Sequence, residues 1–332
     1  MTTRPNLVIA NFEGVRLFDD TDLALLGSVG DVLDPEPLGR WDDPRADDLL
    51  SRADVIVGHW GCPPIDAALL DRAPRLGLIA YAGGTVRETI APEVLGRVRV
   101  TSCADANAEP VAEYTLAMIL LANKDVLWQR DVERDRSLAA VRPASEIPVG
   151  NWDKTIGIVG ASMVGRRVIE LLRPFPELSP LLYDPFVSDD EAQALGVEKV
   201  DLLDLCARAD VVSIHAPDLP STHHMIGERQ IAAMRTGTTL INTARGRLLD
   251  HEALTRHANR LVCVLDVTDP EPLPDDHPLR SAPTVTLTPH LAGSQGTELR
   301  RLAEYATDEI RRFVAGEPGR NVVTAARIDR IA

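Results

Sequence analysis

Residues 154–168 read KTIGIVGASMVGRRV, and this stretch decides the fold of the region around it. An apolar run ends at Val159, Gly160 follows as a turn residue, and a helical pattern begins after Ser162. Gly160 permits a sharp turn at the end of a strand, and Gly165 lets the new helix pack close to that strand. The stretch predicts a strand, a tight turn and a helix N-terminus, an arrangement that can bind a dinucleotide pyrophosphate.

Ser162 stands where the pattern GxGxxG has its middle glycine. That glycine lets the backbone approach the phosphates, and serine adds only a Cβ atom and a hydroxyl that can itself donate to a phosphate oxygen. We expect Ser162 to be tolerated, with the amides of Met163 and Val164 facing the pyrophosphate. A tight turn in any α/β protein is the alternative, and this stretch alone leaves it open.

Asp184 distinguishes between these alternatives and indicates which dinucleotide is bound. It ends the strand-like stretch LLYDP, about 20 residues beyond the turn, where a carboxylate can accept hydrogen bonds from the adenosine ribose. No lysine or arginine follows it before Lys199, so a ribose 2′-phosphate would meet a negative charge without a counter-ion. NAD is therefore favoured over NADP.

Composition excludes several classes of protein. The chain of 332 residues has a formal net charge of −15, which argues against nucleic acid as a partner. No secretory signal begins the sequence, and no apolar run approaches the roughly 18 residues that span a bilayer, so we expect a cytoplasmic protein without membrane contact. The cysteines form no CxxC pair, and His223 and His224 lack partners at metal-ligand spacing, so we expect no metal site.

Strand-like runs alternate with helical stretches along the whole chain, in two successive series. This pattern predicts an α/β fold of two Rossmann-like or flavodoxin-like domains, each a parallel sheet with flanking helices, and a cofactor cleft between them. We expect a discontinuous substrate domain of residues 1–106 and 294–332 and a cofactor-binding domain of residues 107–293. A long helix over 107–131, with Pro110 in its first turn, connects them, and a last helix over 297–314 returns to the first domain.

Three further stretches follow predicted strands, where open α/β sheets place their ligands. They are INTARGRLLD from Ile241, LDVTDPEPLP from Leu265 and LTPHLAGS from Leu287. Two stretches precede them in the chain, ANAEPVAEYTLAMIL and then SIHAPDLPSTHHMI. These five motifs and their order make the chain resemble the D-isomer-specific 2-hydroxyacid dehydrogenase family over nearly its full length. The resemblance implies an NAD-dependent enzyme that interconverts a 2-oxo acid and a (D)-2-hydroxy acid.

The resemblance also assigns catalytic roles to three residues. His290 corresponds to the family's acid–base histidine, which as imidazolium can protonate the nascent alkoxide. Glu271 corresponds to the glutamate that orients this ring and stabilises its cation. Arg245 corresponds to the arginine whose planar fork fits the carboxylate of a 2-oxo acid. Taken singly, each residue could equally belong to a surface turn or a rigid loop.

Cofactor and substrate positions follow from the same motifs. For the cofactor, the resemblance adds His215, Pro217, Thr222, Thr243, Ala244 and Asp266 to Gly160, Ser162, Met163, Val164, Gly165 and Asp184. For the substrate it implies Gly83, Gly84, Asn107 and Trp60 beside Arg245. Some members carry an arginine where this chain has GHWGCPP, so a less charged substrate is expected. Trp60 could equally be a core anchor.

Two other functions stay open beside the dehydrogenase. The first is an NAD(H)-sensing scaffold of the corepressor kind, which would have the same fold but whose function would not depend on catalysis. A formate- or phosphite-type dehydrogenase would keep hydride transfer on another small anion. The apolar helix after Pro110 resembles the family's dimer-forming helix, so we expect a homodimer, although burial between the two domains would explain it nearly as well.

Overall fold

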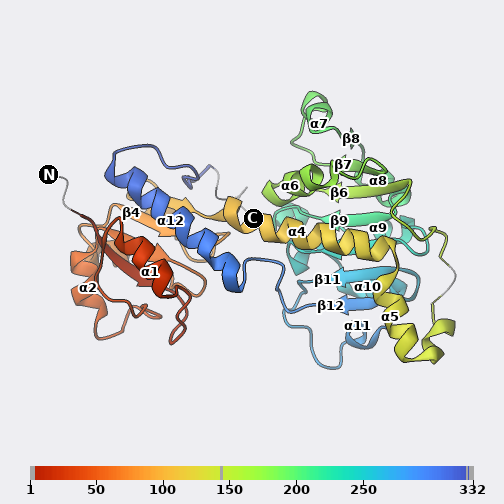
Figure 1. The fold of residues 1–332 in the computed structure, drawn as a ribbon, viewed down its shortest axis with the longest axis horizontal. Helices are drawn as coiled ribbons and strands as arrows, with labels where there is room; N and C mark the ends of the chain where they lie inside the picture. Colours follow the sequence, from red (N-terminus) through yellow and green to blue (C-terminus); the bar gives the residue numbers. More distant parts are fainter. Residues whose placement is uncertain (1–3, 143–144, 327, 329–332) are drawn as a thin grey trace. The chain divides into compact units, whose positions relative to one another are not determined.

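The chain folds into two compact units in the computed structural model (Figure 1), which describes residues 4–142, 145–326 and 328. Unit 1 takes in the chain up to Asn107 together with the part from Ser294 onward, and unit 2 is residues 108–293. The sequence placed these divisions after residues 106 and 293. The ends of the predicted substrate domain, residues 1–3 and 329–332, lie outside the described residues.

Unit 1 is built on a five-stranded sheet of order β2-β1-β3-β4-β5, in which every strand pair is parallel. The strands are β1 Asn6–Ala10, β2 Asp31–Val32, β3 Val55–Gly58, β4 Leu78–Tyr81 and β5 Arg99–Ser102. The connecting helices are α1 Asp20–Gly27, α2 Ala46–Arg52, α3 Ala67–Arg72 and the short η1 Pro92–Val94. This strand order is that of flavodoxin-like sheets.

The last helix, α12 Leu299–Val314, belongs to unit 1, as the sequence predicted. Its residues Leu302, Ala306 and Ile310 are buried in one core with strand residues such as Leu7 and Leu78. The helix begins two residues later than predicted, because residues 296–298 form the separate turn η6. Apolar residues at helical spacing on α12 therefore complete the core of the unit in which the chain starts.

Unit 2 is built on a seven-stranded sheet of order β12-β11-β10-β9-β6-β7-β8, again with every strand pair parallel. The strands are β6 Lys154–Val159, β7 Leu178–Tyr183, β8 Glu198–Lys199, β9 Val211–Ile214, β10 Thr239–Asn242, β11 Val262–Leu265 and β12 Val285–Leu287. The helices that follow strands are α6 Met163–Leu172, α7 Asp189–Leu195, α8 Leu202–Arg208, α9 Glu228–Ala233, α10 His251–His257 and α11 Pro278–Ser281. The order reverses between β6 and β9, which is the switch point of a Rossmann sheet.

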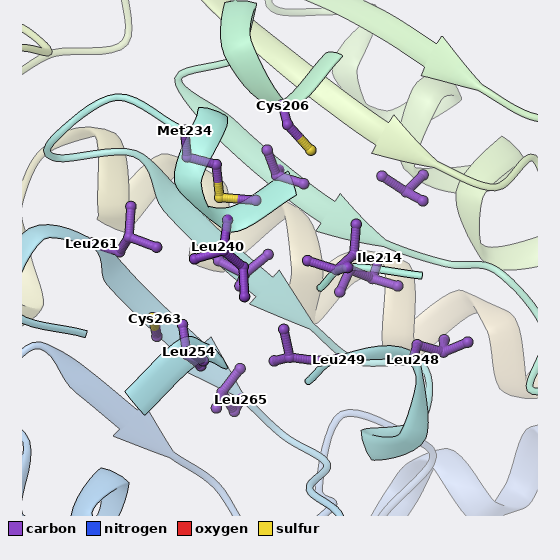
Figure 2. Packing of buried hydrophobic residues seen from close by; sticks show 14 of the residues in the cluster. Cys206, Ile214, Met234, Leu240, Leu248, Leu249, Leu254, Leu261, Cys263 and Leu265 are labelled. Carbon is purple, nitrogen blue, oxygen red and sulfur yellow. The ribbon is translucent and has the colours of Figure 1, made fainter. Parts of the chain in front are cut away.

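Alternate residues of these strands face two separate cores, as expected for a sheet covered on both faces. Ile156, Ile241 and Val264 pack with Ile119 of α4 (Ala104–Asn123) on one face. On the other face, side chains of β9, β10 and β11 pack with Cys206 of α8, Leu254 of α10 and Met234, which follows α9 (Figure 2). The resulting sheet is a rigid base for the loops at its edge.

The predicted single helix over 107–131 is wrong in its bounds. The chain forms α4 from Ala104 to Asn123 and a separate α5 Val126–Arg134, with Asp125 in the left-handed region at φ 56° between them. Arg142 binds both carboxylate oxygens of Asp125, at 2.9 and 2.6 Å, and this distant partner fixes the break. Pro110 lies inside α4 and not in its first turn, because the helix already begins beside Ser102, whose Oγ accepts from the Ala104 amide at 3.2 Å.

The described residues contain no membrane-spanning helix, no disulfide and no cluster of metal ligands. None of their helices combines the length and the apolar character that crossing a membrane would need. All of the cysteines are buried and none is disulfide-bonded. His223 stacks on His224 with ring centroids 3.9 Å apart, and no group of three or more metal-ligating side chains occurs in this part of the chain.

Candidate active site

The predicted cofactor and catalytic residues of unit 2 lie where its parallel strands end. Gly160 follows β6, His215 follows β9, Thr243 follows β10, Asp266 follows β11 and His290 comes shortly after β12. Parallel strands present their carboxyl ends at one edge of a sheet, so these residues share one edge of unit 2. Ligands of open α/β sheets bind at this edge, near the switch point.

Two glycines of the turn after β6 are sterically required. Gly160 has φ +97°, and a Cβ atom there would lie 2.7 Å from the backbone nitrogen of Ala216. A Cβ atom at Gly165 would lie 2.1 Å from the Gly160 carbonyl oxygen. Both positions therefore exclude any side chain, the first by conformation and contact and the second by contact.

Ser162 is in a different situation. Its φ of −65° and ψ of −179° are ordinary extended values, and it is the N-cap of α6, with Oγ 3.4 Å from the Gly165 amide. The helix starts at Met163, so the first-turn amides predicted to face a pyrophosphate are at a helix N-terminus. The middle position of the fingerprint thus imposes no glycine conformation here, and a serine fits as a helix cap.

Asp184 is fixed against the same turn. Its Oδ2 accepts the Ala161 amide at 2.8 Å and its Oδ1 accepts the Phe186 amide at 2.8 Å. Each carboxylate oxygen has a further lone pair, so the group can still accept a ribose hydroxyl. Arg166, the nearby cation of α6, pairs with Glu191 at 2.7 Å.

The loop after β9 uses its predicted cofactor residues to fix its own shape. His215 is buried, its Nε2 lies 2.9 Å from Ser213 Oγ, and burial lowers the pKa of the ring to about 3, so the ring is neutral. Thr222 Oγ1 donates to the Pro217 carbonyl at 2.6 Å and accepts the Leu219 amide at 2.8 Å. These side chains thus support the turn at Gly160 and the loop beside it.

The turn that carries Arg245 is held by its neighbours. Asn242 Nδ2 donates to the Arg245 carbonyl at 2.9 Å, and Asn242 Oδ1 accepts the Ala244 amide at 3.1 Å. A Cβ atom at Gly246 would lie 2.0 Å from the Thr268 carbonyl, so this turn packs directly on the backbone that leads to Glu271. Within the described residues Arg245 forms no ion pair; its Nη1 donates to the Ala244 carbonyl at 2.7 Å, and its remaining N–H groups are available for an anion.

Glu271 and His290 form a hydrogen-bonded pair. The distance from His290 Nδ1 to Glu271 Oε1 is 2.7 Å, and the two side chains are 49% and 41% exposed. Because an ionised carboxylate only accepts, Nδ1 carries the hydrogen and Nε2 is the nitrogen left for a ligand. His290 has a left-handed backbone at φ 52°, so the turn around it must be held from outside.

Asp266 does this. Its buried carboxylate accepts from Thr288 Oγ1 at 2.6 Å and from the amides of Leu291 and Ala292, both at 2.9 Å, while its carbonyl accepts the His290 amide at 2.9 Å. The sequence analysis assigned Asp266 to the cofactor site. In the structure its carboxylate holds the turn of the candidate catalytic histidine.

Apart from Arg245, the predicted substrate residues lie in unit 1. A Cβ atom at Gly83 would lie 2.7 Å from the Tyr81 ring and 3.3 Å from Trp60 Nε1, so Trp60 adjoins the glycine loop. Ser102 Oγ bonds the carbonyls of this loop. Asn107 is a structural link, since its Oδ1 accepts the Ser294 amide at 3.1 Å.

Three functional residues were missed by sequence reasoning: Asn242, Gly246 and Thr288. Each lies within three residues of a predicted catalytic or cofactor residue, at a strand end where side chains shape the turn. An Asn at the end of a strand and a Gly after Arg245 are turn signals that could have marked two of them. Thr288 had no comparable signal, because its partner Asp266 is distant in the sequence.

Comparisons with known proteins show the family of the chain. The profile of the D-isomer specific 2-hydroxyacid dehydrogenase, NAD binding domain, matches residues 116–292. The chain is 32% identical to a glyoxylate reductase of Korarchaeum cryptofilum over 265 residues, which are 78% of this chain and 80% of that protein. It is 29% identical to a D-3-phosphoglycerate dehydrogenase of Methanocaldococcus jannaschii over 84% of this chain, but spans only 53% of that protein.

Among solved structures, the NAD-complexed D-isomer specific 2-hydroxyacid dehydrogenase of Lactobacillus delbrueckii ssp. bulgaricus has the same fold. The TM-score is 0.78 at 20% identity, and the match covers 96% of this chain and all of that one. The matched profile contains the glycine turn, Asp184 and the strand ends that carry Arg245, Glu271 and His290. The chain therefore belongs to the D-isomer specific 2-hydroxyacid dehydrogenase family and carries its NAD-binding domain.

Proposed function

We propose that this protein interconverts a 2-oxo acid and a (D)-2-hydroxy acid, with NAD as the hydride carrier. The observation that carries the proposal is the pair of His290 Nδ1 and Glu271 Oε1, 2.7 Å apart, at the carboxyl edge of an NAD-binding sheet. Arg245 lies in a turn packed on the same loop and forms no ion pair with the described residues. An acid–base pair and an unpaired guanidinium are the groups that reduction of a 2-oxo acid requires.

The roles of these residues follow from their chemistry. Reduced nicotinamide, when bound, supplies a hydride to the carbonyl carbon of the 2-oxo acid. His290 Nε2 gives a proton to the carbonyl oxygen, which becomes the hydroxyl, and Glu271 stabilises the imidazolium through Nδ1. Arg245 binds the substrate carboxylate through its planar fork. In oxidation His290 takes the hydroxyl proton back.

For the substrate we propose Gly83, Gly84, Asn107 and Trp60 as contributors from unit 1. Among the described residues the Gly84 amide donates no hydrogen bond, so it can receive an anion, whereas the Gly83 amide donates to the Cys103 sulfur. At the end of β3 stands His59, which is fully buried, and burial lowers its pKa to about 3. A neutral ring there gives no counter-charge to a phosphorylated side chain, which supports a substrate with an uncharged one.

For the cofactor we propose a preference for NADH over NADPH. Asp184 is fixed at the turn, and Arg166 is engaged with Glu191. A 2′-phosphate at Asp184 would be repelled. Calorimetric titration of the purified protein with each nucleotide measures the preference. Tighter binding of NADPH would contradict it.

The central test is His290→Ala. We expect turnover of 2-oxo acids to fall by about 10²-fold or more, while NADH binds as in the unchanged protein, because the side chain supplies the proton and not the nucleotide site. A screen of 2-oxo acids with uncharged side chains, with NADH as the reductant, provides the assay. If formate or phosphite is oxidised faster than any 2-hydroxy acid, the protein is instead a formate- or phosphite-type dehydrogenase. NADH binding without turnover of any of these would favour the NADH-sensing scaffold.

We also propose a homodimer formed through the region of α4 and α5. Leu116, Leu120 and Leu121 of α4 are only half buried, and Trp152 is 73% exposed; its neighbour Asn151 donates through Nδ2 to the Leu120 carbonyl at 3.2 Å. Large apolar side chains left at one surface region are typical of an association surface. Sedimentation at micromolar concentration should give a dimer, and Trp152→Glu should shift it toward monomer. A monomeric unchanged protein would refute the proposal.

A further inference from the structure

Two adjacent residues of α4, Tyr114 and Thr115, reach the two turns that carry the candidate catalytic residues. Tyr114 Oη lies 3.0 Å from Thr288 Oγ1, next to the His290 turn. Thr115 Oγ1 lies 3.2 Å from Thr243 Oγ1, next to the Arg245 turn. All four residues belong to unit 2, where α4 runs along one face of the sheet (Figure 1).

The direction of the first hydrogen-bond chain is fixed by counting hydrogens. Asp266 as a carboxylate only accepts, so Thr288 must use its single hydroxyl hydrogen toward Oδ1, at 2.6 Å. Tyr114 must therefore be the donor to Thr288. Burial raises the pKa of the Tyr114 phenol, so the hydroxyl keeps its hydrogen and stays a donor. The chain runs from Tyr114 to Thr288 to Asp266, whose other bonds hold the backbone of residues 290–292.

The second chain is fixed in the same way. Thr115 Oγ1 donates to the Val111 carbonyl at 2.8 Å within α4. Its hydrogen is used there, so Thr243 must donate to Thr115 across the 3.2 Å contact. Both hydroxyls are buried, which fixes the first residue of the Thr243–Arg245 turn against the helix.

We propose that Tyr114 and Thr115 are positioning residues, which set the His290 turn and the Arg245 turn at fixed places relative to one helix. The inference rests on the proposed function of His290 and Arg245. Neither residue acts on substrate itself: each acts through a threonine hydroxyl at a strand end. A small misplacement of an acid or an anchor lowers turnover without necessarily weakening nucleotide binding, so their removal should act on kcat.

The test compares single-hydroxyl deletions with a matched control. Tyr114→Phe and Thr115→Val each remove one hydroxyl, and Thr115→Ser keeps it. Tyr305→Phe is the control, because the Tyr305 hydroxyl is buried in unit 1 and has no hydrogen-bond partner among the described residues. We expect kcat to fall about threefold to tenfold in Tyr114→Phe and Thr115→Val, with unchanged NADH Kd, and to stay at the unchanged level in Thr115→Ser and Tyr305→Phe.

A second measurement separates positioning through Thr288 from a general structural effect. If Tyr114 acts through Thr288, then Tyr114→Phe should cost nothing further in a Thr288→Val background. Losses that simply add in the double variant, or a kcat that falls only in step with Tm or with NADH affinity, would overturn the inference.

The outcomes also distinguish this inference from the proposed function. The positioning role alone would be overturned by the following result. The unchanged protein is active and His290→Ala is inactive, but Tyr114→Phe and Thr115→Val have the same kcat as Tyr305→Phe. An unchanged protein without activity on any 2-oxo acid, or a His290→Ala variant with full activity, would overturn the proposed function, and the inference with it.

Discussion

Ser162 and Gly165 occupy one helix start under different steric limits. Ser162 has extended backbone angles and caps α6, whereas a Cβ atom at Gly165 would lie 2.1 Å from a carbonyl oxygen. We expect Ser162→Gly to lower the free energy of unfolding by a few tenths of a kcal/mol, because glycine is a nearly adequate N-cap. NADH affinity should change by less than about threefold. Urea denaturation and calorimetric titration measure the two quantities.

Gly165→Ala is the matched change at the same turn. We expect it to destabilise unit 2 by about 2 kcal/mol or more and to weaken NADH binding, because the strand and helix must separate to admit the methyl group. A Gly165→Ala protein as stable as the unchanged one would show that the close contact at this turn can relax. A large loss of NADH affinity in Ser162→Gly would show that the serine hydroxyl contributes to phosphate binding.

At the scale of elements, α12 is tied to α1 by a partly buried ion pair. Arg300 Nε donates to Asp22, whose side chain is only 4% exposed, and Arg300 Nη2 lies 3.2 Å from Asp19. Arg300→Met would leave the Asp22 carboxylate, which is only 4% exposed, without its cation, so we expect the stability of unit 1 to fall by more than in the control below. Arg16→Met is the control, because Arg16 pairs with the 91% exposed Asp20, and it should cost less than about 0.5 kcal/mol. Equal losses in the two variants would contradict the argument.

Long apolar runs predicted the main strands of both sheets well, because a buried parallel strand needs a continuous apolar sequence. The sequence does not predict the edge strands β2 Asp31–Val32 and β8 Glu198–Lys199, because each has only two residues and these are mostly exposed, which leaves no apolar run. The break between α4 and α5 depends on Arg142, which reaches Asp125 only in the folded chain. Local pattern therefore predicts elements that bury their own residues and fails where a distant partner decides.

In the candidate site, too, local sequence patterns predict some features, and distant contacts decide the others. His290, Glu271 and Arg245 could be named from motifs, because each motif follows a strand. The contacts that arrange these residues could not be predicted from motifs. Asp266 accepts hydrogen bonds from the amides of residues 291 and 292, and Gly246 packs on Thr268 across the sheet edge. Such contacts depend on which strands are neighbours, and the sequence alone gives no strand order.

For the whole molecule, buried histidines in both units predict a loss of stability toward acid pH, and His251 of unit 2, whose pKa burial also lowers, adds to the two strongest cases. Burial lowers the pKa of His59 in unit 1 and of His215 in unit 2 from 6.5 to about 3. Below pH 6.5 the unfolded chain therefore binds protons that the folded chain does not, so stability falls as the pH drops from about 6.5 toward 3. Each histidine should cost its unit about 1 kcal/mol between pH 7 and 5.5, a range in which most carboxyl groups stay ionised.

Urea denaturation at several pH values checks this prediction. His59→Gln and His215→Gln should each flatten the pH dependence of the unit that holds them. His223→Gln, which changes an exposed side chain, should leave it unaltered. A stability that is constant from pH 7 to 5.5 in the unchanged protein would mean that the two rings are protonated in the folded state.

The hydrogen bond between Asn107 and Ser294 has a consequence for how the chain can be cut. It joins the last residue of unit 1 before unit 2 to the first residue after it, at 3.1 Å. Unit 2 is therefore inserted into unit 1 between two neighbouring points, and a linker of a few residues from 107 to 294 would close unit 1 without stretching it. The excised unit 2, starting at residue 108, would have Pro110 in the first turn of its leading helix, where a proline starts a helix well. The chain thus resembles a continuous small domain that carries a complete nucleotide-binding domain as a removable insert.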